Sequence, residues 1–293
     1  MRRAHRFPLL AAMRPRQWTK NAVVLAAFVF AVGDASQPVR IIDLWRAAGA
    51  FAFFCLVASG IYLLNDVRDR AQDQRHPQKK SRPIAAGELA PRTALLASAI
   101  LVLAGVAAGW ALTPALAWIL GAYVALQILY TLALRQVALV DLILVALGFV
   151  LRAVAGAVVI EAEISPWLLV CAFLLALFLI LCKRRQEKAS AGEDNHETRG
   201  SLRDYPLPLL DQLIAVTAGA TIVSYAIYTL SPETVAKFET YRLSWTLPFV
   251  VFGVFRYLDL AYRYGLGERP EEVLLTDGPL LLDVVLYGVA VLL

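Results

Sequence analysis

The sequence predicts an all-α integral membrane protein, a single bundle of transmembrane helices with polar loops at its ends. Of its 293 residues, 59% are hydrophobic and only 17% are charged. Its mean hydropathy of +0.63 lies far above that of soluble globular proteins. Apolar runs recur along the whole chain, and no polar segment is long enough for a separate soluble domain. We therefore expect residues 1–293 to form one transmembrane domain, with cap loops at about 65–91 and 183–208.

Nine stretches combine the length and the apolarity of membrane-spanning helices. In chain order they cover about 19–33, 44–64, 92–112, 115–134, 138–160, 166–182, 209–230, 245–263 and 279–293. The first and the last are the shortest. No A-x-A-like cleavage site follows the first stretch, so we expect no removed signal peptide.

The connections between these spans differ in their charge. Basic residues are frequent before the first span, between the second and third, and between the sixth and seventh, whereas the other connections contain few. Because Lys and Arg are enriched in cytoplasmic loops, this pattern places the N-terminus and these connections in the cytoplasm, and the C-terminus outside. Membrane-flanking loops thus explain the net charge of +5, and we expect no nucleic-acid partner.

Directly after the second span, the acidic segment Asn65–Asp73 carries three carboxylates at helical spacing. Asp66, Asp69 and Asp73 stand at i, i+3 and i+7, and on a helix they would share one face. Carboxylates on one face repel one another unless a cation lies between them, and oxygen ligands favour Mg²⁺ completed by substrate phosphates. The spacing therefore predicts that these three residues, with Asn65, bind Mg²⁺. A solvated loop of mixed charge is the alternative interpretation.

Basic residues follow the acidic segment at the same membrane edge. Lys79, Lys80 and Arg82 precede a turn that contains Pro83 and Gly87. Cations beside metal-binding carboxylates suit a substrate with several phosphate groups. We therefore predict that Lys79, Lys80 and Arg82 bind substrate phosphates.

Polar residues in and near the fifth span add further candidates. Tyr130 and Arg135 border the short turn before it, close enough to join the site. Asp141 at its start lies eleven residues before Arg152, about three turns away on the same helical face, and an interfacial residue is the alternative interpretation of Asp141. Arg152 lies near its middle, where a charge is costly and normally faces the bundle interior or a wet cavity. Two interpretations of Arg152 stay open: contact with a substrate phosphate, or partnership with another buried polar group.

The end of the sixth span carries a basic cluster, Lys183 and Arg184, followed by Glu187 on the same helical face as Lys183. Basic residues at a cytoplasmic helix end are also a routine topology signal, which is the alternative interpretation. In the next loop, Arg203 offers a guanidinium for bidentate phosphate binding and Tyr205 a neutral hydroxyl donor. We predict that all five contribute to substrate binding, opposite the acidic segment.

Cysteines and histidines do not indicate another chemistry. Cys55, Cys171 and Cys182 lie in or at the ends of spans without paired spacing, and they are predicted to be apolar fillers. The three histidines are scattered along the chain, so a zinc site is not expected.

Two motifs together resemble the UbiA superfamily of intramembrane prenyltransferases. They are Asn65-Asp66-x-x-Asp69-x-x-x-Asp73 and His76-Pro77-x-Lys79-Lys80-x-Arg82-Pro83-Ile84-Ala85-x-Gly87. The resemblance covers nearly the whole chain and implies nine transmembrane helices around a central cavity that opens to the cytoplasm. Members of the superfamily hold Mg²⁺ on an isoprenyl diphosphate with two aspartate-rich motifs. Where the second motif is expected, this chain has Lys183-Arg184-Arg185-Gln186-Glu187.

This exchange of acidic for basic residues, with Arg14-Pro15-Arg16-Gln17-Trp18-Thr19-Lys20-Asn21 near the start, is similar to one branch of the superfamily. The resemblance implies that the chain joins the phosphoribosyl group of 5-phosphoribosyl diphosphate to decaprenyl phosphate, a polyprenyl phosphate, and releases pyrophosphate. The branch's product feeds arabinose donors for cell-wall polysaccharides, which implies a bacterial plasma membrane and a cytoplasmic active site. One diphosphate needs one Mg²⁺–carboxylate site, and the two monophosphates need only cations. Lys20 is then expected to position the lipid headgroup.

Two other functions stay open at this point. One is prenylation of an aromatic ring from a prenyl diphosphate, which the missing second acidic motif disfavours. The other is transport of an anionic lipid or metabolite, for which no inverted repeat or broken-helix pair is visible. Small residues such as Gly105, Gly109, Gly148 and Gly156 indicate close helix packing, either within one chain or between the chains of a homo-oligomer.

Overall fold

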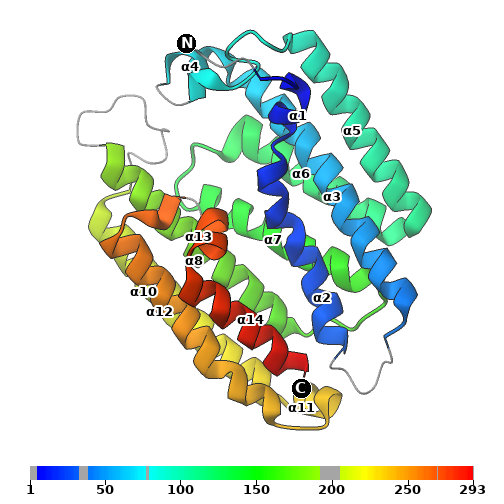
Figure 1. Ribbon diagram of the computed structural model, residues 1–293, viewed down its shortest axis with the longest axis vertical. Coiled ribbons are helices and arrows are strands. Elements are labelled where there is room, and N and C mark those ends of the chain that lie inside the picture. Colours follow the sequence, from blue (N-terminus) through cyan, green and yellow to red (C-terminus); the bar gives the residue numbers. More distant parts are fainter. Residues whose placement is uncertain (1–4, 33–38, 77–78, 192–204, 269, 293) are drawn as a thin grey trace.

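The computed structural model describes residues 5–32, 39–76, 79–191, 205–268 and 270–292. All regular secondary structure in these ranges is helical, which confirms the all-α prediction. The helices form an elongated bundle, with the N-terminal helix α1 (Pro8–Met13) at one end and α11 (Pro232–Phe238) at the other (Figure 1).

Each of the nine predicted spans coincides with a helix in the described residues. They are α2 (Val23–Val32), α3 (Ile41–Arg68), α5 (Pro91–Leu112), α6 (Pro114–Leu129), α7 (Val140–Val159), α8 (Pro166–Ala191), α10 (Leu207–Leu230), α12 (Leu247–Arg263) and α14 (Gly278–Leu292). Seven candidate membrane spans among the described residues are long and apolar enough to cross a bilayer. Two of the nine helices, α2 and α14, are not among these seven, because they have only 10 and 15 residues. The count of nine crossings is therefore not confirmed.

The first predicted span is shorter than expected because its beginning is not α-helical. The polar residues before α2 form the 3₁₀ helix η1 (Pro15–Ala22), which starts with a proline. Helices α5, α6 and α8 also begin with a proline. Proline suits this position because the first N–H groups of a helix have no hydrogen-bond partner within it, so the N–H that proline lacks is not needed.

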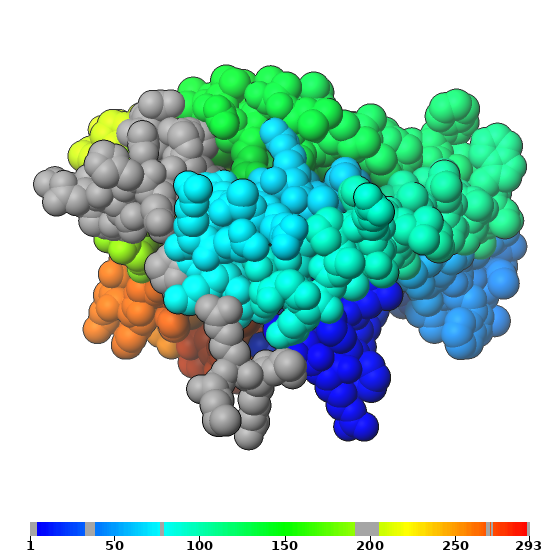
Figure 2. All heavy atoms as spheres, turned by 90° about the horizontal axis from the view of Figure 1, so that it is seen from above, coloured from blue at the N-terminus to red at the C-terminus, as the bar shows by residue number. Residues whose placement is uncertain are grey.

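The short helices lie at the ends of the bundle or connect the long helices. Besides α1, η1 and α11, they are α4 (Arg70–Arg75), η2 (Lys79–Ser81), the π-helical turn η3 (Tyr130–Leu134), η4 (Arg242–Thr246), η5 (Leu266–Glu268) and α13 (Pro270–Thr276). We call the end that carries α1, α4, η2 and η3 the cap end. Figure 2 looks onto it and shows the segment 65–91 (cyan) across the middle of the face.

Tryptophans mark the opposite end. Five of the six lie at the helix termini farthest from the cap end, namely Trp45, Trp110, Trp118, Trp167 and Trp245. Trp118 and Trp245 are 74% and 75% exposed. A ring of exposed aromatic side chains at one level is typical of a membrane–water interface.

Glycines allow the central helices to approach closely. A Cβ atom at Gly156 on α7 would overlap the carbonyl oxygen of Val24 on α2, and one at Gly105 on α5 would lie 2.7 Å from the Val57 side chain on α3. A Cβ atom at Gly109 would lie 2.7 Å from the Leu120 side chain on α6, whereas one at Gly148 would meet Tyr123 at an ordinary contact distance of 3.6 Å. Gly105, Gly109 and Gly156 therefore allow close packing within one chain.

We expect Gly156→Ala to destabilise the protein, because the added methyl group would force α2 and α7 apart. Overpacking of this kind costs about 1–3 kcal/mol. Thermal unfolding of the purified protein in detergent measures the effect. The control is Gly121→Ala, where a Cβ would meet nothing within 4 Å; equal melting temperatures for the two variants would contradict the close α2–α7 contact.

Candidate active site

The cap end brings together the two polar groups that the sequence predicts. The acidic segment closes α3 and forms α4, whereas the basic cluster lies near the end of α8. Between them runs the connection from α6 to α7, which begins with η3.

The acidic segment is not one continuous helix. Helix α3 ends at Arg68 and α4 begins at Arg70, so Asp69 lies in the break between them. Asp66 and Asp73 share a partner, because Nη1 of Arg82 lies 3.1 Å from the Asp66 carboxylate and 2.7 Å from that of Asp73. Asp69 instead pairs with Arg135 at 2.7 Å. The prediction that the three carboxylates share one face of an unbroken helix is therefore wrong at Asp69.

Arginines neutralise the carboxylates of the acidic segment. Asp66 and Asp73 are both buried, at 3% exposure. Asp66 accepts hydrogen bonds from Arg14 as well as from Arg82. Buried charges are tolerated in proteins only when they are paired, and these contacts supply the pairs. Arg14 belongs to the N-terminal motif Arg14–Asn21, but its charge is one of several there, and nothing in the sequence predicted that it pairs with Asp66.

The π-helical turn η3 forms the other wall of the acidic segment. Thr131 in this turn donates a hydrogen bond of 3.0 Å to the Asn65 side chain, and Arg135 directly after it reaches Asp69. A π turn holds one more residue than an α turn and often occurs at functional sites. Arg135 thus lies beside the acidic segment as expected, whereas Thr131 had no signal in the sequence.

The basic cluster is centred on Arg184, which is only 5% exposed. Its Nη1 donates to Glu187 at 2.7 Å, and its Nε lies 3.5 Å from the carboxylate of Asp141. That Nε has no hydrogen-bond partner in the described part of the chain. Lys183 is more exposed, and its Nζ lies 3.9 Å from Glu187. The cluster therefore contains a buried guanidinium with an unused donor beside a more accessible lysine.

The connection from η3 to α7 lies between the acidic segment and the basic cluster. Thr131 in η3 binds Asn65, and Asp141 in the first turn of α7 lies 3.5 Å from Arg184. The acidic segment and the buried guanidinium thus border the same stretch of chain, residues 130–141. This proximity is the central geometric feature of the cap end.

The remaining lysines predicted to bind substrate lie on the short helices η1 and η2. Lys79 and Lys80 lie on η2, next to Arg82, with Lys80 exposed and the backbone N–H of Lys79 bonded to His76. Lys20 lies on η1, partly buried. Arg203 lies outside the described residues.

Tyr205 does not present its hydroxyl to a substrate. The residue is 1% exposed, its hydroxyl donates to Asp141 at 2.9 Å, and it accepts the backbone N–H of Leu139. Burial raises its pKa to about 12, so the hydroxyl keeps its proton. Its partners are protein groups, and we replace the predicted phosphate contact with a structural one.

Arg152 is also held by protein groups. Its guanidinium donates hydrogen bonds of 2.7–2.8 Å to the Asn21 side chain, the Gly148 carbonyl and the Tyr123 hydroxyl. The ring of Phe149 lies 5.2 Å from its central carbon, within cation–π range. These contacts favour the structural interpretation of Arg152 over the phosphate contact.

The donors of the acidic segment suit Mg²⁺. In the described residues, Asp66, Asp69 and Asp73 each use one oxygen for arginine partners, and the second oxygen of each accepts no hydrogen bond. The part of the chain that the structure describes contains no group of three His, Cys, Asp or Glu side chains that could hold a metal. Mg²⁺ usually binds through one or two carboxylates together with substrate phosphates, and the second oxygens of these aspartates would supply ligands of that type.

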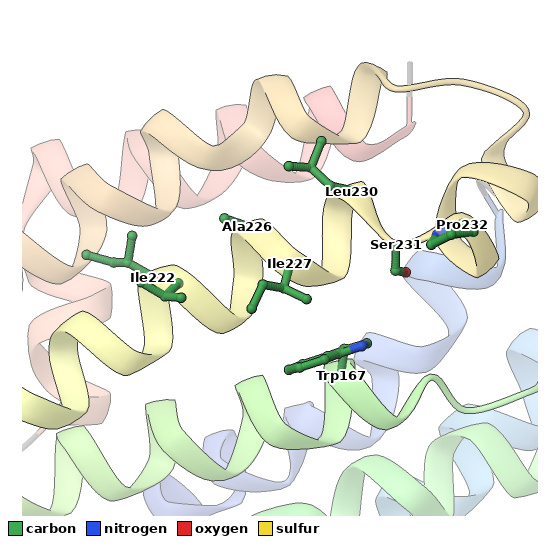
Figure 3. Close-up of a pocket in the computed structure, with 8 residues that line it drawn as sticks. Trp167, Ile222, Ala226, Ile227, Leu230, Ser231 and Pro232 are labelled. Carbon is green, nitrogen blue, oxygen red and sulfur yellow. The ribbon is translucent and has the colours of Figure 1, made fainter.

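An apolar groove at the opposite end offers a different environment. It measures about 510 Å³ and lies between Trp167 on α8 and the end of α10, with Ile222, Ala226 and Ile227 along one side (Figure 3). No charged residue lines it. The groove therefore offers hydrocarbon contacts but cannot neutralise a phosphate.

Comparison with known proteins gives the following similarities. The profile of the UbiA prenyltransferase family matches residues 20–192. The decaprenyl-phosphate phosphoribosyltransferase of Mycolicibacterium smegmatis is 34% identical over 276 residues, 92% of this chain and 86% of that protein. The protein of the same name from Corynebacterium glutamicum is 37% identical over 274 residues, which are 92% of this chain and 81% of the relative.

The fold is similar to that of solved UbiA structures. A UbiA homolog from Archaeoglobus fulgidus, bound to GPP and Mg²⁺, aligns with a TM-score of 0.73 over 98% of this chain and 99% of that one. The two sequences are 19% identical, so this likeness concerns the fold alone.

We expect Arg152→Gln to lower the stability of the protein, because Asn21 and Tyr123 lose a charged partner inside the bundle. Breaking a buried charged hydrogen-bond network costs about 2–4 kcal/mol. Thermal unfolding in detergent measures the loss. The control is Arg263→Gln, at an arginine whose side chain is 71% exposed. An unchanged melting temperature for Arg152→Gln, together with weakened phosphate binding, would restore the phosphate interpretation.

Proposed function

The chain belongs to the UbiA prenyltransferase family, and we propose that it transfers the 5-phosphoribosyl group of phosphoribosyl diphosphate to a polyprenyl phosphate, decaprenyl phosphate as in its named relatives. Pyrophosphate is the second product. The relatives named decaprenyl-phosphate phosphoribosyltransferase align with 92% of the chain. Its product would serve arabinose-donor synthesis for the cell wall.

One observation carries this proposal: carboxylates for a metal-bound diphosphate and a buried arginine for a phosphate border the same connection, from η3 to the first turn of α7. Asn65 accepts a hydrogen bond from Thr131 in η3, and Arg184 lies 3.5 Å from Asp141 at the start of α7. A donor with one diphosphate and one monophosphate needs this combination of an acidic and a basic half. A prenyl diphosphate has no second phosphate-bearing end for the basic half to bind.

The acidic half would bind the leaving group. Asp66 and Asp73, with Asp69 and Asn65 beside them, would hold Mg²⁺, which supplies positive charge to the diphosphate as it departs. Arg82, which already contacts both Asp66 and Asp73, would donate hydrogen bonds to diphosphate oxygens. Lys79 and Lys80 would add positive charge from η2.

The basic half would bind the remaining phosphates. Lys183 and Arg184 would donate to phosphate oxygens, and Glu187, which lies near both cations, would orient them. Lys20, on η1, would attract the lipid headgroup. Arg203, from the loop after α8, is proposed as an additional phosphate contact.

The reaction itself needs no side-chain nucleophile. An oxygen of the lipid phosphate, already an anion, forms a bond to the anomeric carbon of the ribose. The bond from that carbon to the diphosphate oxygen breaks, and pyrophosphate leaves with the electron pair. The protein contributes orientation and charge, which can together supply a large part of the rate enhancement.

We further propose nine membrane crossings in a bacterial plasma membrane, with the cap end in the cytoplasm and the central cavity opening there. Helices α2 and α14 would be the two short crossings. The charges at the cap end and the tryptophans at the other end support this orientation.

The direct test is incubation of the purified protein with Mg²⁺, labelled phosphoribosyl diphosphate and decaprenyl phosphate. We expect labelled lipid and an equal amount of pyrophosphate. No labelled lipid, with product formed instead from a prenyl diphosphate and an aromatic acid, would replace this proposal with aromatic prenylation. The transporter alternative is not carried forward, because the named relatives are transferases.

We expect Asp66→Asn to reduce turnover by on the order of 100-fold or more, because the neutral amide removes a metal-binding charge while it keeps the shape. Initial rates of labelled-lipid formation at saturating Mg²⁺ measure the loss. The matched control is Glu88→Gln on the same cap loop, at a carboxylate that pairs with His5 rather than with an arginine. Wild-type turnover in Asp66→Asn would contradict the metal assignment.

We expect Lys183→Ala to raise the KM for phosphoribosyl diphosphate about ten-fold, with a smaller change in kcat. A hydrogen bond to a charged group contributes about 1.5–3 kcal/mol, and about 1.4 kcal/mol corresponds to a factor of ten. The control is Lys188→Ala, further along the same helix. An unchanged KM in Lys183→Ala, or an equal rise in both variants, would show that Lys183 does not bind the sugar phosphate.

A further inference from the structure

The connection between η3 and α7 contains a backbone conformation that leucine rarely adopts. Leu139 has a φ of 65° and a ψ of −41°. Positive φ brings a β-carbon too close to the backbone, so a non-glycine residue keeps it only when its surroundings hold it there. The Leu139 side chain does not provide that hold, because the residue is 50% exposed.

The hydroxyl of Tyr205 holds the Leu139 turn. It accepts the hydrogen bond of the Leu139 N–H, across 66 residues of sequence. Tyr205 lies just before the start of α10 and is packed in the largest buried cluster, with Leu142 and Leu210. The core thus fixes the position of the hydroxyl, and the hydroxyl adds a long-range contact to a turn that the Asp141 N–H closes locally through the Val137 carbonyl.

The same hydroxyl leads to the basic cluster. It donates to one oxygen of Asp141, which is fully buried in the first turn of α7. The other oxygen of Asp141 lies 3.5 Å from Nε of Arg184. One connected set of polar contacts therefore runs from the backbone of Leu139 through Tyr205 and Asp141 to Arg184.

This set of contacts controls the segment that separates the two halves of the site. Residues 130–139 carry Thr131 and Arg135 to the acidic segment. The segment is anchored at its far end by the Leu139 turn. A shift of that turn would move both contacts together, and displacements of about 1 Å in an active site can cost on the order of 100-fold in rate.

We propose that Tyr205 and Asp141 are positioning residues of the transferase reaction: Tyr205 holds the Leu139 turn and thereby segment 130–139, and Asp141 directs the buried Arg184. The assignment rests on the proposed function. Neither residue touches the substrate; both act through groups that do.

The first test is Tyr205→Phe, which removes the hydroxyl and keeps the ring. We expect kcat/KM for phosphoribosyl diphosphate to fall at least ten-fold, with a melting temperature within a few degrees of the wild type. The matched control is Tyr257→Phe, at another buried tyrosine, whose hydroxyl bonds to the Gly267 carbonyl instead. The control should keep wild-type kinetics.

The second test separates positioning from general packing. Glycine adopts positive φ without the steric penalty, so Leu139→Gly combined with Tyr205→Phe should be more active than Tyr205→Phe alone. Leu139→Gly by itself should stay close to the wild type. A double variant no better than Tyr205→Phe, or a loss of activity matched by an equal loss of thermal stability, would overturn the proposal.

Amide hydrogen exchange provides a readout that does not need the reaction. Peptides covering 135–141 should exchange at least ten-fold faster in Tyr205→Phe than in the wild type, whereas peptides from α5 should not change. Unchanged exchange would overturn the proposed role of the hydroxyl. If the wild-type protein forms no labelled phosphoribosyl lipid, the proposed function fails, and the exchange result still decides whether Tyr205 holds the turn.

Discussion

The pairing of carboxylates with arginines at the end of α3 is the interaction on which the cap end depends. Three aspartates close together at a membrane boundary repel one another and lose hydration, so each needs a nearby cation. Arg14, Arg82 and Arg135 supply these cations from three different parts of the chain. The electrostatic requirement of one short segment thereby fixes the N-terminal segment, the loop after α4 and the connection from α6 to α7.

These pairs also relate the stability of the site to its proposed chemistry. A metal-bound diphosphate brings both positive charge for the carboxylates and negative charge for the arginines. The groups that neutralise each other in the structure can thus bind substrate without a large change in buried charge. The basic half is neutralised in the same way, because Arg184 lies between the carboxylates of Glu187 and Asp141. Its Nε has no hydrogen-bond partner among the described residues.

Below the cap end, the bundle is held by a different kind of contact. Glycines allow α2, α3, α5 and α7 to pack at short distance, and Arg152 connects η1, α6 and α7 through neutral partners. This buried cation is stabilised by hydrogen bonds and by the faces of aromatic rings. This layer gives the charged cap end a rigid support.

The sequence by itself determined the membrane class, the positions of the long helices and the end at which the charges gather. Apolar length and loop charge are local properties, and they act in the same way whatever the neighbouring helices are. Only the tertiary structure decided that Asp69 takes a different arginine from Asp66 and Asp73, that Arg14 and Arg135 pair with aspartates 52 and 66 residues away, and that Tyr205 and Arg152 bind protein groups. A helical spacing rule assumes an unbroken helix, and it fails at Asp69 because α3 ends one residue earlier. The partner of a charge depends on which helices pack together, and that arrangement is set by contacts between distant segments.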